Sequence, residues 1–274
     1  MKSRCVFCVI IGALAAGCST NPVTGKRELI LIPESQEIAM GEEAAPQFEK
    51  EFGGATAEPR LQDYVQSLGG KLAAASDREG MPWSFTLVNS DIPNAFALPG
   101  GKVFITAGLF GSLDNERQLA AVLGHEIGHV CAKHNVKGMQ RQMGAEAFTK
   151  IVNELAGGKS SVQSAAKIVS SMAVLRYSRD DEYQADALGV RYMERAGHNP
   201  WGMVETLEFL QTLGGVEPGR FQEMFLTHPL TSKRIEAVKT KVVRDYARYS
   251  PHQGDSAKAR FLEMRGLLQA RTAK

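Results

Sequence analysis

Cysteine is scarce in this sequence and unevenly placed. The chain has four cysteines in 274 residues, and Cys5, Cys8 and Cys18 all lie near its start. Only Cys131 lies further along, so a domain formed by the later residues cannot hold an internal disulfide. This excludes a small disulfide-bonded secreted scaffold, and we expect Cys131 to be a buried packing residue.

Long hydrophobic runs are also missing. An apolar stretch at residues 6–16 follows Lys2 and Arg4, but its eleven residues are too few to span a bilayer as a permanent helix. A basic start, a short apolar run and small residues at its end are typical of a signal peptide. The pattern therefore predicts a signal peptide at residues 1–17.

The sequence LAAGCST at the end of this stretch resembles a bacterial lipobox. In such sequences a cysteine is lipidated and becomes the new amino terminus, which would make Cys18 the lipid anchor and residues 18–33 a tether. Ser19 in the next position, rather than aspartate, is similar to lipoproteins sorted to the outer membrane of Gram-negative bacteria. The alternative is plain secretory cleavage nearby, with Cys18 an incidental thiol.

Neither sign of charge is in clear excess. The formal net charge is +2, and loss of Lys2 and Arg4 with the signal peptide brings it to zero. This balance gives no support to a nucleic-acid partner. Residues 220–274 depart from it, with twelve Lys or Arg against five Asp or Glu. That segment is either an ordinary solvated helical face or a contact surface for an anionic partner.

Helical periodicity dominates the rest of the chain, which has no internal repeat. Helices are expected at residues 35–52, 59–75, 114–134, 179–196, 201–213, 232–246 and 257–270, with two amphipathic helices, as a lid or as plain packing, in 135–174. Between Trp83 and Phe110, β-favouring runs broken by Ile-Pro-Asn and Pro-Gly-Gly predict a small antiparallel sheet. We therefore expect an α+β, mostly helical domain at residues 34–250 and a basic helical segment at 251–274.

The stretch LAAVLGHEIGHVCAKH, residues 119–134, is apolar enough for a buried helix, yet it carries His125, Glu126 and His129. Helix positions four apart project side by side, so the two imidazoles could bind one metal ion. Glu126 lies beside the first histidine, where it could serve as a general base without binding the metal. This is the His-Glu-x-x-His arrangement of zinc peptidases. An uncompensated glutamate in an enclosed helix would cost several kcal/mol, which argues against an ordinary surface helix.

Two other features of this helix concern its neighbours. Asp114 is expected to cap its start. Gly124 and Gly128 lie on a side where another backbone could approach closely. His134 falls about 140° around the helix from His129, so we expect it outside the metal site, at the helix end.

A catalytic zinc also needs a third protein ligand. The downstream candidates are Glu146, Glu154, Glu182 and Glu194. The segment SRDDEYQADALG favours Glu182, because Asp186 lies one turn later on the same face and can orient a ligand histidine. We expect Asp186 to accept a hydrogen bond from His125 or His129, and the spacing leaves that choice open.

Together these segments resemble the zinc metallopeptidase family that includes HtpX, the CAAX prenyl proteases and the periplasmic proteases BepA and LoiP. The resemblance extends over NPVTGKRELILIPESQEIAMG, NAFALPGGKVFITAGLF, HEIGHVCAKH, RDDEYQADALG and THPLTSKRI. It implies a gluzincin-type fold and one Zn²⁺ per chain, bound by His125, His129 and Glu182. Without transmembrane helices or room for a carboxy-terminal repeat domain, the chain is most similar to short LoiP-like lipoproteins. The resemblance also implies a periplasmic endopeptidase that degrades misfolded or stalled envelope proteins.

Two further segments carry candidate site residues. His228, in THPLTS, could donate to the oxyanion of the reaction, complete a closed zinc site, or simply begin a helix before Pro229. The segment NAFALPGGKVF resembles the family's strand beside the cleft. An extended substrate could pair with it from Asn94 and Ala95 onwards, or the segment could simply complete the sheet.

Two rival functions fit parts of the sequence. One is a chaperone or assembly factor for outer-membrane proteins, in which zinc is structural and His228 closes the site. The other is a passive structural lipoprotein, which leaves Glu126 unexplained. No residue pattern identifies the substrate or the oligomeric state.

Overall fold

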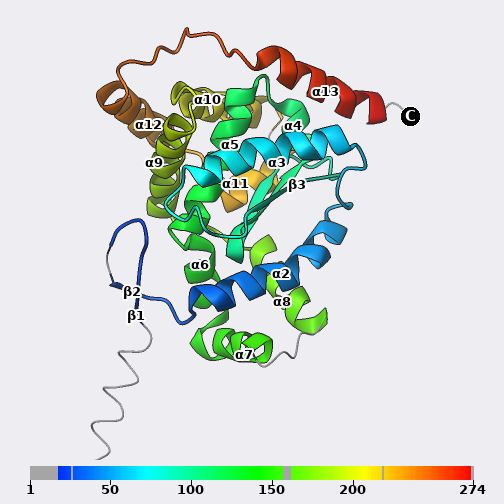
Figure 1. Cartoon of the computed structure of the whole chain (residues 1–274), viewed down its shortest axis with the longest axis vertical. Coiled ribbons are helices and arrows are strands. Elements are labelled where there is room, and N and C mark those ends of the chain that lie inside the picture. The colour runs from blue at the N-terminus through cyan, green and yellow to red at the C-terminus, as the bar shows by residue number, and fades with distance from the viewer. Residues whose placement is uncertain (1–17, 26, 157–161, 218, 273–274) are drawn as a thin grey trace, which may run out of the picture.

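A three-stranded sheet between two groups of helices forms the centre of the computed structural model, which describes residues 18–25, 27–156, 162–217 and 219–272 (Figure 1). The strands are β3 (Ser84–Val88), β4 (Ala95–Leu98) and β5 (Lys102–Thr106), in the order β3-β5-β4. The predicted α+β, mostly helical class is confirmed. The prediction of an all-antiparallel sheet is wrong, because β3 and β5 run parallel while β4 and β5 are antiparallel.

The turn between β4 and β5 explains the mixed sheet. Residues Pro99–Gly101 form a short 3-10 turn, η1, in which Gly100 has a φ of 73°. A Cβ on Gly100 would lie 2.7 Å from the Cα of Ile38 in α2 (Glu34–Glu51). Both the positive φ and this close contact therefore require glycine. This turn folds β5 back between β4 and β3, and the link at residues 89–94 passes across the end of β5. Local turn signals do not reveal such a crossing.

Most helices begin and end close to their predicted positions. Besides α2 they are α3 (Pro59–Ala74), α4 (Ala107–Ser112), α5 (Glu116–Cys131), α6 (His134–Met143), α7 (Ala145–Ala156), α8 (Val162–Ala173), α9 (Arg179–Arg195), α10 (Trp201–Val216), α11 (Gln222–Thr227), α12 (Ser232–Asp245) and α13 (Lys258–Thr272). The described parts of residues 134–173 thus contain three helices where two were expected, and α11 was not predicted. None of the helices in the described ranges is both long and apolar enough to cross a membrane.

The two faces of the sheet pack into different hydrophobic cores. Ala95 and Ala97 of β4 point into the core that also contains α3 and α5, while Phe96 and Leu98 point into the core formed with α2, α7 and α8. This alternation is the normal period of a strand that is covered on both faces. It places β4 between the motif helix α5 on one side and α2 on the other.

Helix α5 carries the metal-binding motif through the interior. Asn115, not the predicted Asp114, caps it, because the Asn115 side chain accepts a hydrogen bond from the backbone N–H of Gln118 at 2.9 Å. The close approach predicted at its glycines is confirmed: a Cβ on Gly128 would lie 2.8 Å from the Ala185 carbonyl oxygen of α9. Cys131 is buried and free, as predicted.

The predicted end of this helix at His134 is wrong. Helix α5 ends at Cys131, and Lys133 adopts the left-handed conformation with a φ of 57°. The chain therefore turns, and His134 becomes the first residue of α6. Lys133 is buried with its ammonium 3.7 Å from Glu37 Oε2, and the Glu37 carboxylate also accepts two hydrogen bonds from Arg78. These buried ion pairs accompany a backbone conformation that lysine rarely adopts.

The two ends of the described chain both pack on this domain. Strands β1 (Cys18–Thr20) and β2 (Arg27–Leu29) form a small antiparallel pair, and between them Asn21 is buried and donates to the Ala132 carbonyl oxygen at 3.3 Å. In α13, Phe261 and Leu268 belong to the same core as α3 and α5. The basic segment predicted at residues 251–274 therefore contributes α13, which packs on the main core, while residues 251–257 are turns and irregular structure.

Candidate metal centre

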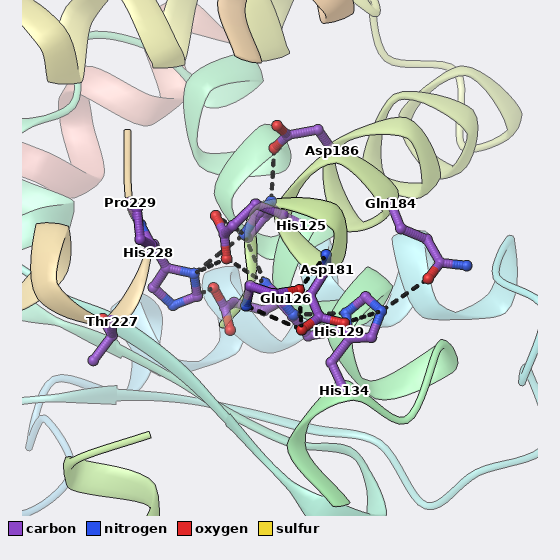
Figure 2. Close-up of polar contacts among 12 residues, drawn as sticks. His125, Glu126, His129, His134, Asp181, Gln184, Asp186, Thr227, His228 and Pro229 are labelled. Carbon is purple, nitrogen blue, oxygen red and sulfur yellow. Dashed lines mark hydrogen bonds and ion pairs between the residues drawn. The ribbon is translucent and has the colours of Figure 1, made fainter. Parts of the chain in front are cut away.

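Four buried side chains from three elements converge on one point, and Figure 2 labels the three histidines among them. His125 and His129 come from α5, Glu182 from the first turn of α9, and His228 from the residue that follows α11. One ligand atom from each lies within 4.8 Å of the other three. The Nε2 atoms of His125 and His129 are 2.9 Å apart, and Glu182 Oε1 lies 3.2 Å from His129 Nε2.

Asp186 determines which nitrogen of His125 faces this point. Its Oδ1 lies 2.9 Å from His125 Nδ1, and a carboxylate can only accept. His125 therefore carries its hydrogen on Nδ1 and turns the lone pair of Nε2 inward. The choice that the sequence left open is thus settled for Asp186, whose partner is His125. Burial alone would raise the pKa of Asp186, but Arg234 and the hydrogen bond with His125 hold it below its usual value.

A longer chain of contacts orients His129. Its Nδ1 lies 3.0 Å from Nδ1 of His134, whose Nε2 faces Gln184 Oε1 at 2.9 Å and Asp181 Oδ1 at 3.4 Å. Both oxygens are acceptors, so His134 carries its hydrogen on Nε2 and accepts at Nδ1. His129 must then donate from Nδ1, which leaves its Nε2 lone pair directed inward (Figure 2).

The expected position of His134 is therefore wrong in part. It is not among the four converging groups, as predicted, but it does not lie at the end of α5 either. The left-handed turn at Lys133 brings it back onto His129, where burial lowers its pKa. The helical-wheel argument did not apply to His134, because the helix stops before reaching it.

Glu182 is fully buried and carries a negative charge. Burial alone would raise its pKa, but the positive charge of the neighbouring His228 and the hydrogen bond from His228 hold the pKa well below its usual value. Arg234 of α12 also contacts it, with Nη1 2.5 Å from Glu182 Oε2. A buried carboxylate that stays ionised is suited to bind a cation.

The other glutamates that were candidates for the third ligand position lie elsewhere. Glu194 is near the end of α9 and pairs with Arg248. Glu154 of α7 accepts a hydrogen bond from Ser164 of α8, and Glu146 is in the first turn of α7.

Glu126 lies beside the converging groups and has a different environment. It is buried, its Oε1 is 3.7 Å from His228 Nε2, and its Oε2 has no hydrogen-bond partner in the described part of the chain. Burial raises the pKa of this carboxyl group. An unsatisfied buried carboxylate oxygen next to two inward imidazole lone pairs fits a site built for a metal ion and a water molecule.

His228 lies in the short link between α11 and α12. It follows the last residue of α11 and precedes Pro229, and α12 begins only at Ser232, capped by Thr231. The reading of His228 as a helix-start residue is therefore wrong. Its Nδ1 lies 3.0 Å from Glu182 Oε1 and 3.3 Å from His125 Nε2. Burial would lower the pKa of His228, but the charges of Glu182 and Glu126 raise it overall.

Comparison with known proteins agrees with this geometry. Residues 59–242, which span α3 to α12 and all four converging groups, match peptidase family M48. The chain belongs to peptidase family M48. Its cluster of three histidines and one glutamate is where the family's metal cofactor would be held.

Several M48 proteins are similar over most of this chain. A beta-barrel assembly-enhancing protease of Escherichia coli (strain K12) is 30% identical over 264 residues, which cover 92% of this chain and 53% of that protein. The metalloendopeptidase OMA1 of Schizosaccharomyces pombe is 28% identical over 246 residues, covering 84% of this chain and 70% of that protein. Metalloprotease YcaL of Escherichia coli (strain K12) is 27% identical over 185 residues, covering 67% and 69%. The chain spans about half the length of the beta-barrel assembly-enhancing proteases.

Two residues of this M48 centre were not found from the sequence. Arg234 is 4% exposed and binds Asp186 with two hydrogen bonds of 2.8 Å, while also contacting Glu182. Its signal was a charged residue on the apolar face of α12, one turn before Val238. Tyr177 stacks on His129 with ring centroids 3.8 Å apart, and nothing in its local sequence marks it.

Strand β4 forms one wall of the M48 cleft. Thr106 donates its backbone N–H to the Asn94 carbonyl at 3.0 Å, so the main-chain groups of Ala95 and Ala97 point to the outer edge of the sheet. At this edge the Ala95 N–H donates to the side chain of Asn94 at 2.9 Å, and the Ala97 carbonyl oxygen accepts a hydrogen bond from the side chain of Asn135 at 3.4 Å. Ala95 lines the same cavity as His125, Glu126 and His228. The edge is therefore within reach of an extended chain that enters the site.

Proposed function

We propose that this chain is a zinc-dependent endopeptidase, with His125, His129 and Glu182 binding the metal and Glu126 acting as general base. The observation that carries the proposal is the convergence of two inward Nε2 lone pairs and an ionised carboxylate beside a buried, unpartnered oxygen of Glu126. Imidazole and carboxylate ligands in this number are those of a catalytic zinc site. Bound Zn²⁺ would polarise the scissile carbonyl and lower the pKa of water.

Glu126 moves the proton in this reaction. Its Oε2 accepts the proton of the attacking water and then delivers it to the nitrogen of the departing amine. The raised pKa that burial gives Glu126 favours holding the proton between these two steps. Asp186, His134 and Arg234 act indirectly, because they fix the orientation of the imidazoles and the charge of Glu182.

The substrate would bind as an extended chain along β4. Main-chain hydrogen bonds to the outward groups of Ala95 and Ala97 would fix the scissile bond next to Glu126 with little demand on sequence. For this pairing the side chain of Asn94 must release the Ala95 N–H, and the side chain of Asn135 must release the Ala97 carbonyl oxygen. An extended substrate must be unfolded, at least locally.

The cellular setting follows from the amino-terminal sequence and the relatives. We place the enzyme in the periplasm, anchored to the outer membrane by lipid on Cys18, where it degrades misfolded or stalled envelope proteins. The lipobox-like LAAGCST supports the anchor. The similarity to beta-barrel assembly-enhancing proteases supports the substrate class.

One observation favours a second candidate function. His228 adds a fourth donor to the centre, and four protein ligands around zinc are typical of a closed, structural site. The chain would then be a chaperone or assembly factor for outer-membrane proteins.

The substitution Glu126→Gln separates the two functions. Purified wild-type protein should bind one zinc per chain and cleave an unfolded protein such as reduced casein. The E126Q variant should keep the zinc, measured by elemental analysis, and lose turnover by at least about a hundredfold. Equal cleavage by both proteins would rule out Glu126 as the base. No cleavage by either, with zinc bound, would favour the chaperone.

A further inference from the structure

Three exposed apolar side chains surround one groove. Ile92, Val174 and Leu226 are 46%, 61% and 43% exposed, although they belong to residue types that are usually buried. They come from the β3–β4 link, the α8–α9 link and α11, yet all line a groove of about 390 Å³. Phe96 of β4 also lines it. An apolar site assembled from segments so far apart in sequence is a formed surface feature rather than a chance exposure.

This groove is adjacent to the metal centre along both of its walls. On the sheet side, Asn94 lines the groove and the next residue, Ala95, lines the cavity that contains His125 and Glu126. On the helical side, Thr227 lines the groove and the next residue, His228, lines that cavity. Figure 2 shows Thr227 and His228 in succession at the side of the site.

Strand geometry links the groove to a bound substrate. Side chains of β4 alternate, with Ala95 facing the metal-centre side of the sheet and Phe96 facing the groove side. A chain that pairs with the outer edge of β4 presents its own side chains with the same alternation, so the residue opposite Phe96 points into the groove. Its neighbours in sequence point towards the cavity beside Glu126.

We propose that this groove is a subsite for one large apolar side chain of an extended polypeptide substrate, within a few residues of the scissile bond. The inference rests on the proposed peptidase function. It adds a preference for the type of substrate side chain, which main-chain hydrogen bonds alone do not provide. Five apolar side chains, those of Phe52, Ile92, Phe96, Val174 and Leu226, line the groove together with polar and charged ones that include Glu51, Arg176 and Glu223. Leucine, isoleucine, phenylalanine or methionine at this substrate position should therefore be favoured over small polar residues.

The test uses the zinc-loaded enzyme and pairs of fluorogenic peptides. Cleavage sites in reduced casein, found by mass spectrometry, provide a parent peptide, and each position near the cut is made leucine or serine in turn. The groove variant is Ile92→Ser with Leu226→Ser. The matched control is Val216→Ser with Val243→Ser, whose apolar side chains are 72% and 55% exposed and do not line the groove.

One peptide position should respond to the groove variant. We expect wild type and control to prefer leucine there by roughly tenfold in kcat/KM, as apolar pockets of this kind allow. The groove variant should lose that preference and keep its kcat/KM for the serine peptide within about twofold. A leucine preference that survives in the groove variant at every position would overturn the proposal, as would equal losses for both peptides.

Two further measurements keep this test separate from the proposed function. Ile92→Lys should create a preference for glutamate at the same position, which a merely structural role of Ile92 would not produce. Binding of the peptides to zinc-loaded E126Q, followed by fluorescence anisotropy, tests the groove without cleavage. A groove-dependent leucine preference in binding without any wild-type cleavage would count against the peptidase alone. Cleavage without groove-dependent preference would count against the subsite alone.

Discussion

Replacing Arg234 with leucine should reveal how much the buried charges behind the metal centre depend on one cation. Arg234 makes two 2.8 Å hydrogen bonds to Asp186 and approaches Glu182 Oε2 to 2.5 Å. The two carboxylates are 1% and 0% exposed, so water cannot replace the guanidinium. Removing one partner of a buried ion pair costs about 3–5 kcal/mol, and here the free energy of unfolding of the metal-free protein should fall by that amount.

Urea denaturation of wild type and Arg234→Leu, followed by circular dichroism in the presence of a chelator, measures this loss. Zinc should reduce it, because the metal supplies Glu182 with another positive charge. The double variant Arg234→Leu/Asp186→Asn should recover part of it, because one of the two stranded charges is gone. A loss below about 1 kcal/mol in the metal-free single variant would refute the reasoning, since the carboxylates would then have found other compensation.

The ion pair between Arg234 and Asp186 also predicts how the stability of the protein depends on pH. The pKa of Asp186 is lowered in the folded protein, chiefly by Arg234 against the opposing effect of burial. A lowered carboxyl pKa contributes stability that is present above its unfolded value of about 4 and is lost as the pH falls through the folded value. The difference in stability between wild type and Arg234→Leu should therefore shrink as the pH is lowered below about 4, and a difference that grows there would contradict the assignment.

Three other changes test separate parts of the structure. His134→Ala removes the acceptor that fixes His129, so zinc affinity measured by chelator competition should fall about 10–100-fold, and unchanged affinity would exclude the relay through Gln184. Gly128→Ala places a methyl group 2.8 Å from the Ala185 carbonyl oxygen, so thermal unfolding should show a loss of about 1–3 kcal/mol, whereas a neutral change would mean that α5 and α9 can separate freely. Removal of metal by 1,10-phenanthroline should abolish peptidase activity and added zinc should restore it, and activity that persists in the chelator would contradict a metal-dependent reaction.

The part of the site predicted from sequence is the part with fixed helical spacing. His125, Glu126 and His129 share one helix, and Glu182 and Asp186 share another, so the period of a helix was enough to pair them. His228 could be named only as a candidate with several roles, because its approach to Glu182 joins residues that are 46 positions apart in sequence. Arg234 was missed because its hydrogen-bond partner, Asp186, is 48 residues away in sequence.

The errors in the fold have equally local causes. The sheet direction depended on a crossing at residues 89–94 that turn residues do not encode. The placement of His134 depended on a single left-handed residue, Lys133, which is not a type expected in that conformation. A helical wheel assumes that the helix continues, but α5 ends before His134. The ion pairs of Lys133 and Arg78 with the buried Glu37 lie at this end of the helix.

The buried position of Asn21 limits where this enzyme could work. A lipid on Cys18, as proposed, would be separated from Asn21 by only two residues of chain, a span of at most about 10 Å. The hydrogen bond from Asn21 to the Ala132 carbonyl oxygen holds this part of the chain against the carboxy-terminal end of α5. If Cys18 carries the proposed lipid, so short a link would keep the proposed peptidase at the membrane, and it would cut only polypeptides that lie next to the bilayer surface.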